Sequence, residues 1–220
     1  MFSSQIIGHM YDKIFVVGFN KTATTTFHAL FEANDLSSQH SREWDDDVYT
    51  CFSDGMLWLN KIKRLKLKHP NSIFILNIRP LRAWLLSRFR HGLRMNQAWA
   101  YPCTSQLCIT WINNREEYYN QVLEWFKGAP DRLIIVDITN PNWMQYISEI
   151  LDFKQTDIPS ENVFAIDYQN SGERDIIQIV DSTLDDLQYT QEERDNILFR
   201  DTSLTEHYCR IYRNNLGIFC

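Results

Sequence analysis

A lysine and a group of threonines follow a short apolar run near the start of the chain. The run ends at Gly18, and the polar side chains come next, at Lys21, Thr22, Thr24, Thr25 and Thr26. A lysine supplies a point charge to anionic oxygens, and hydroxyl groups supply hydrogen-bond donors. Capping a helix would need only one of the four threonines. These residue types at this spacing therefore predict a loop that binds a phosphate or a sulfate.

The scarcity of glycine limits what kind of phosphate-binding loop this is. The chain has 220 residues and seven glycines, and the two nearest each other, Gly8 and Gly18, lie ten residues apart. The dinucleotide-binding fingerprint and the Walker A loop each need two or three glycines within about six residues. Both motifs are excluded, so a phosphate-binding loop in this chain works with one glycine.

The loop resembles the 5′-phosphosulfate loop of the sulfotransferases that use 3′-phosphoadenosine 5′-phosphosulfate (PAPS). The family pattern is G-x-x-K-[ST]-G-T-T. This chain matches it at Gly18, Lys21, Thr22, Thr24 and Thr25, and departs from it once, at Ala23. We expect alanine to adopt a helical conformation at position 23 without strain, because alanine begins a helix readily.

A second block is similar to the part of the same family that binds the 3′-phosphate. In the family an arginine ends a strand and a serine follows eight residues later, as Arg79 and Ser87 do here. Trp84 falls where one branch of the family has tryptophan. Pro80 departs from the usual R-x-P by following the arginine directly, which leaves Arg82 open as an additional ligand. Weaker likenesses, at residues 49–55 and 133–138 and at His40, extend to about residue 152.

The resemblance implies a sulfotransferase that moves a sulfuryl group from PAPS to a hydroxyl or amine of a carbohydrate or small-molecule acceptor, with adenosine 3′,5′-bisphosphate as product and no metal. Lys21 would stabilise the bridging oxygen of the leaving group. The residues that would bind PAPS are Gly18, Asn20, Lys21, Thr22, Ala23, Thr24, Thr25 and Thr26 in the loop, and Arg79 and Ser87 at the 3′-phosphate. Two alternatives stay open: a kinase-like nucleotide phosphotransferase, and a non-catalytic protein that binds adenosine bisphosphate.

Transfer to a hydroxyl also needs a general base. His40 is the first candidate, because an imidazole titrates near neutral pH and the resemblance places it on the acceptor side. Asp54 and the run 45–47, which is Asp-Asp-Asp, are the competitors. His28 is interpreted as a packing residue of the first helix.

Aromatic residues gather between residues 99 and 126. Trp111, Tyr118 and Trp125 recur every seven residues, which favours core packing along one helix face. Trp99 and Tyr101 precede that helix, and they are candidates for contacts with the acceptor.

Strand and helix patterns alternate along the chain, which is 44% hydrophobic. Apolar runs predict strands at 13–18, 72–79 and 132–137, and helical periodicity predicts helices at 24–33, 56–68, 80–95, 106–127, 142–151, 173–188 and 190–199. Strands that are apolar throughout indicate a parallel sheet covered on both faces. We therefore expect one α/β domain over 1–220, three-layered and of the P-loop kinase-like type, with a less recognisable helical tail from about residue 153.

Charge and cysteine content narrow the partners and the location. Between Gly55 and Arg115 the chain has eleven Lys or Arg and no Asp or Glu, although the net charge is −6. This distribution suggests a site for a compact polyanion rather than for nucleic acid. The five cysteines form no CxxC pair, and we expect reduced thiols in the cytoplasm, without a signal peptide or membrane span. The sequence does not indicate an oligomeric state.

Overall fold

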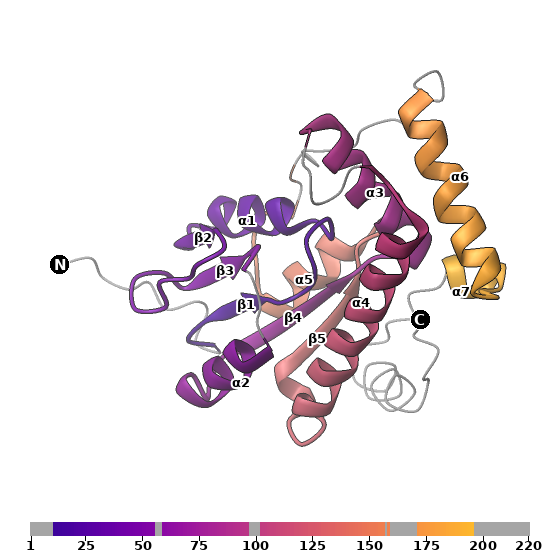
Figure 1. Ribbon diagram of the computed structural model, residues 1–220. Helices are drawn as coiled ribbons and strands as arrows, with labels where there is room; N and C mark the ends of the chain where they lie inside the picture. The colour runs from indigo at the N-terminus through magenta and orange to yellow at the C-terminus, as the bar shows by residue number, and fades with distance from the viewer. Residues whose placement is uncertain (1–10, 56–58, 97–101, 157, 159–170, 196–220) are drawn as a thin grey trace. The chain divides into compact units, whose positions relative to one another are not determined.

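A computed structural model of the chain describes residues 11–55, 59–96, 102–156, 158 and 171–195 (Figure 1). The chain divides into two compact units. The first unit is formed by Met1–Ile78 and Gly128–Val163, and the second by Arg79–Lys127 and Phe164–Cys220.

The first unit is built on a five-stranded sheet in which every pairing is parallel. Its strands lie in the order β2-β3-β1-β4-β5 and span Ile14–Val16 (β1), Ser38–His40 (β2), Cys51–Ser53 (β3), Ile73–Ile78 (β4) and Leu133–Asp137 (β5). The prediction of a parallel α/β sheet is confirmed. The sequence analysis did not anticipate β2 and β3, which have only three residues each.

Helices flank this sheet. In the first unit they are α1 (Thr24–Ala33), α2 (Leu59–Lys68) and α5 (Trp143–Leu151), and a 3₁₀ turn at Pro130–Arg132 leads into β5. The chain crosses one way from β1 through α1 to β2, and the opposite way from β3 through α2 to β4. Right-handed crossovers therefore place α1 and α2 on opposite sides of the sheet, as Figure 1 shows.

Aromatic rings fill much of the core of the first unit. Phe15 on β1 lies between its register partners Phe52 and Phe74, with ring centroids 5.0 Å from each. Phe27 of α1 packs against Trp143 of α5 at 4.8 Å, which joins these two helices. Apolar residues at successive strand positions thus hold the sheet between its helices, and the loops at its edge are left for the site.

The second unit consists of helices in the part that the structure describes. They are α3 (Leu81–Arg94), α4 (Ser105–Phe126), α6 (Ser171–Asp186) and α7 (Gln191–Asp195). Trp111 and Tyr118 of α4 are buried and Trp125 is half-buried, so the prediction that the seven-residue repeat packs in the core is confirmed for two of its three residues. Among the described residues, no helix combines the length and apolar character that crossing a membrane would need.

Parallel strands place all their carboxyl ends at one edge of the sheet. The predicted anion-binding loop follows β1 there, His40 ends β2, and Asp54 follows β3. In open parallel sheets this edge is where ligands bind. The fold therefore brings the loop and two of the candidate bases to the same edge of the first unit.

Candidate functional site

The loop between β1 and α1 is fastened at both ends by one buried asparagine on the neighbouring strand β4. The side-chain Oδ1 of Asn77 accepts a hydrogen bond from the backbone N–H of Gly18 at 2.8 Å. Its Nδ2 donates to the hydroxyl of Thr22 at 2.7 Å and also to the carbonyl of Thr22. Asn77 and Thr22 are both fully buried, so this side chain fixes the shape of the loop from beneath.

Gly18 is required by this close approach. A Cβ atom at position 18 would lie 2.1 Å from the backbone oxygen of Asn77 and 2.3 Å from its Oδ1. Both distances are far shorter than a van der Waals contact. The single glycine of the loop pattern thus permits a strand and a loop to touch.

The backbone of the loop alternates in the sign of φ. Lys21 has φ 66° and Ala23 has φ 65°, whereas Thr22 between them is not among the residues with positive φ. Alternation of this kind turns successive N–H groups toward a common point, as in the anion-binding concavities of phosphate loops. The loop also leads into the first turn of α1, which has no acidic side chain.

The conformation of Ala23 corrects the expectation from the sequence. Ala23 is the N-cap of α1, with φ 65° and ψ 28°, in the left-handed region rather than the helical one. That region favours glycine, because a Cβ atom there is crowded by the backbone. Alanine at this position therefore carries the strain of a conformation that glycine adopts freely.

The four threonines divide into different roles. Thr22 donates its hydroxyl to the carbonyl of Phe19 and is fully buried, so it stabilises the loop from inside. Thr24 and Thr26 are buried in the first turn of α1, whereas Thr25 is half-buried. Thr25 is therefore the threonine of the first turn whose side chain is best exposed for a ligand.

His40 and Asp54 face one another at the ends of β2 and β3. The His40 Nδ1 lies 2.8 Å from the Oγ of Ser53, its register partner on β3. The His40 Nε2 lies 3.9 Å from Oδ2 of Asp54. Thr24 completes the link to the loop, because its hydroxyl lies 3.4 Å from the other oxygen of Asp54.

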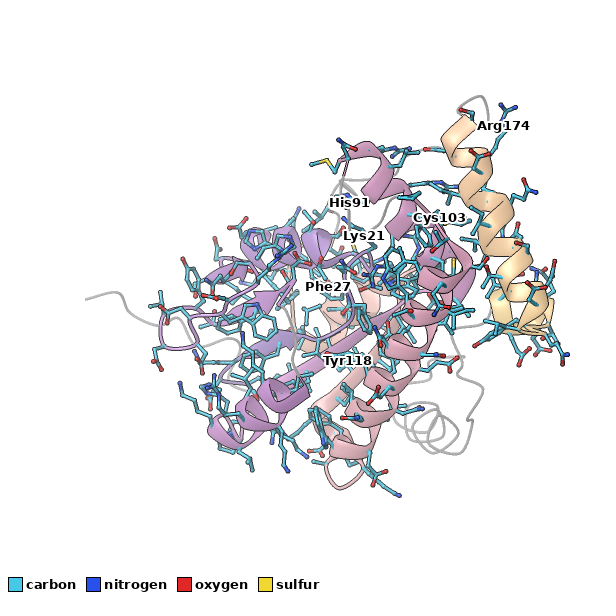
Figure 2. The ribbon with its side chains drawn as sticks, viewed as in Figure 1. Lys21, Phe27, His91, Cys103, Tyr118 and Arg174 are labelled. Carbon is cyan, nitrogen blue, oxygen red and sulfur yellow. The ribbon has the colours of Figure 1, made fainter. Side chains whose placement is uncertain are left out.

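Burial and the surrounding charges together lower the pKa of His40. Burial lowers the pKa of His40, and the carboxylate of Asp54 acts in the opposite direction. The positive charges of His28 and Lys21 lower that pKa further. Figure 2 shows Lys21 on the segment between β1 and α1.

The acidic run at 45–47 lies toward the opposite edge of the sheet, because Asp46 and Asp47 pair with Lys68, at the end of the helix that leads into the amino end of β4. Asp46 bonds to Nε2 of His69 at 2.7 Å and to Nζ of Lys68 at 2.8 Å. Burial raises the pKa of Asp46, but the hydrogen bonds from these two partners prevail and lower it to about 2. Asp46 and Asp47 of this run are thus held in ion pairs with Lys68.

Arg79 and Ser87 belong to the second unit. The backbone carbonyl of Arg79 accepts a hydrogen bond from Nη2 of Arg115 at 2.9 Å, which fixes the chain just before α3. Burial lowers the pKa of Arg79, and the charge of Arg90 lowers it further. Ser87 is half-buried and lies three residues before Arg90, on neighbouring positions of one helix face.

Carboxylates of α6 hold other arginines of α3. Arg82 forms a two-pronged ion pair with Asp181, at 2.6 and 2.8 Å. Glu173 is 2% exposed and faces both Arg90, at 3.6 Å, and Arg94, at 2.9 Å. Arg82, the additional ligand left open by the sequence, therefore already has a carboxylate partner within its own unit.

The sequence analysis missed Asn77 and Ser53, which position the loop and His40. Asn77 did leave a trace in the sequence, because it is the one polar residue in the strand Ile73–Ile78. Trp99 and Tyr101, the candidates for acceptor contacts, lie outside the described residues. No protein-family model and no curated protein matches the chain.

Proposed function

We propose that the protein is a PAPS-dependent sulfotransferase that transfers a sulfuryl group to a hydroxyl or amine of a carbohydrate or small-molecule acceptor. The observation that carries the proposal is the meeting of the loop with His40 and Asp54. Thr24 contacts Asp54, Asp54 faces His40, and the charge of Lys21 acts on His40. The loop that carries Lys21 thus lies at the same edge of the sheet as His40 and Asp54, which supports the proposal of a cationic group and a base at one site.

The proposed roles follow from this geometry. The N–H groups of the loop and the hydroxyl of Thr25 hold the 5′ oxygens, and Lys21 stabilises the charge that develops on the bridging oxygen. His40 accepts the proton of the acceptor at Nε2 as the oxygen–sulfur bond to the acceptor forms. The bond from sulfur to the 5′-phosphate oxygen breaks in the same step, and adenosine 3′,5′-bisphosphate leaves with the electron pair.

The orientation of His40 suits this proton transfer. If Nδ1 donates its proton to the hydroxyl of Ser53, Nε2 carries a lone pair on the side of Asp54. The 3.9 Å between Nε2 and Asp54 leaves a carboxylate beside the incoming hydroxyl, where it can also accept a hydrogen bond. Arg79 and Ser87 are proposed to bind the 3′-phosphate.

The proposal is tested by incubating the protein with sulfur-labelled PAPS and a panel of sugars, phenols, alcohols and amines. Wild type is expected to label at least one acceptor class, and the Lys21→Ala and His40→Ala variants to do so at least about a hundredfold more slowly. Lys63→Ala is the matched control, because it removes the same charge as Lys21→Ala from an exposed lysine of α2. Phosphoryl transfer from ATP–Mg without transfer from PAPS would instead identify a kinase-like phosphotransferase.

A further inference from the structure

The rings of His28 and His40 stack against one another, although they come from a helix and a strand. His28 lies on α1 and His40 ends β2, with ring centroids 5.6 Å apart and planes inclined by 21°. Their side chains are each about one quarter exposed. A near-parallel contact of this kind limits how far either imidazole can rotate.

The two imidazoles make the same pattern of polar contacts. The Nδ1 of His28 lies 2.8 Å from the hydroxyl of Ser38, just as the Nδ1 of His40 lies 2.8 Å from that of Ser53. The Nε2 of His28 then faces a carboxylate oxygen of Glu32, at 3.6 Å. Hydroxyl contacts at Nδ1 and a ring contact on one face therefore hold His28 in a single orientation against its neighbour.

The charged groups around His40 come from three directions. Asp54 approaches from the end of β3, Lys21 from the loop after β1, and His28 from α1. Asp54 favours the protonated imidazole, whereas Lys21 and the protonated form of His28 oppose it. Of these three residues, His28 is the one whose ring contacts the ring of His40. No step of the proposed transfer uses His28.

We propose that His28 is a positioning residue, which holds the imidazole of His40 by stacking and opposes its protonation, so that Nε2 stays open to accept a proton from the acceptor. The catalytic role of His28 in this inference rests on the proposed function. The electrostatic effect of His28 on His40 does not depend on that function. With charges 5.6 Å apart and water-like screening, removing His28 should raise the pKa of His40 by about half a unit.

The experiment follows the titration of each histidine side chain by NMR, without any substrate, in wild type and two variants. His28→Gln keeps a polar group opposite Ser38, and His28→Phe keeps a ring against His40; both remove the charge. Both variants are expected to raise the titration midpoint of His40. Asp54→Asn should lower it, and His69→Gln, at the opposite edge of the sheet, should leave it unchanged.

A midpoint of His40 that stays unchanged or falls in the His28 variants would overturn the inference. Where an active acceptor is found, the acid limb of kcat/KM should move to higher pH in both variants by the same half unit. The two proposals fail separately. A raised midpoint of His40 in the His28 variants without any PAPS-dependent transfer contradicts only the proposed function, whereas transfer with an unmoved acid limb contradicts only the role of His28.

Discussion

The side chain of Asn77 accepts the backbone hydrogen bond of Gly18, 59 residues earlier in the chain, at 2.8 Å. The same amide group donates to Thr22, so one residue of β4 closes the loop that follows β1. A buried polar side chain in an otherwise apolar strand is costly unless its hydrogen bonds are satisfied. Here they are satisfied by the loop, which makes the shape of the site depend on the core of the sheet.

Asn77→Ala should lower the free energy of unfolding by about 3 kcal/mol, because it leaves the N–H of Gly18 and the carbonyl of Thr22 buried without this partner. Urea unfolding measures the loss. Asn114→Ala, on the exposed face of α4, is the matched control and should stay within about 0.5 kcal/mol of wild type. Equal stabilities of the two variants would contradict the role given to Asn77.

Ala23→Gly should raise the free energy of unfolding by about 1 kcal/mol, because glycine adopts φ 65° without the crowding that alanine suffers. Ala29→Gly, in the middle of α1, should have the opposite effect, a loss of about 1 kcal/mol. Thermal unfolding of the two variants tests this prediction, because the two substitutions should change stability in opposite directions. A loss of stability at both positions would show that position 23 is not held in the left-handed region.

Arg79→Ala should remove the preference for adenosine 3′,5′-bisphosphate over adenosine 5′-monophosphate, because the proposed ligand of the 3′-phosphate is lost. We expect the ratio of the two dissociation constants to fall about tenfold in calorimetry. Arg82→Ala is the control, since Arg82 is already paired with Asp181. Arg82→Ala should lower the free energy of unfolding and leave the ratio of dissociation constants unchanged. A ratio that falls in Arg82→Ala and not in Arg79→Ala would instead assign the 3′-phosphate site to Arg82.

Asp46→Asn should destabilise the fold in a pH-dependent manner. The pKa of Asp46, about 2, lies below its ordinary value, so its stabilising effect is complete above about pH 4 and is lost as the pH falls toward 2. We expect a difference of about 1 kcal/mol from wild type at neutral pH, after screening by water. Urea unfolding at pH 7 and at pH 3 measures it; a difference that grows on acidification would contradict the assignment.

The sequence predicted the elements that repeat a clear pattern. The apolar runs at β1, β4 and β5 and the periodic faces of α1 and α4 lie where expected, within a few residues. The strands β2 and β3 were missed because Ser38–His40 and Cys51–Ser53 are short and carry no apolar run. Their strand conformation comes from pairing with neighbours, which no local pattern records.

The site was predictable in its residue types and not in its geometry. Lys21 and the threonines follow from the loop pattern, but the left-handed backbone of Ala23 contradicts the helical preference of alanine. The contact of Asn77 with the loop joins residues more than fifty positions apart. The stacking of His28 on His40 likewise depends on how α1 packs beside β2, so the sequence assigned His28 only to packing.

The most direct test of the account is a calorimetric titration of wild type, Lys21→Ala and Lys63→Ala with adenosine 3′,5′-bisphosphate and with ATP–Mg. We predict that wild type binds the bisphosphate with a dissociation constant on the order of micromolar, and ATP–Mg at least about tenfold more weakly. Lys21→Ala should weaken binding of the bisphosphate by about tenfold or more, and Lys63→Ala should match wild type. Equal or tighter binding of ATP–Mg, or an effect of Lys21→Ala no larger than that of Lys63→Ala, would contradict the proposed PAPS site.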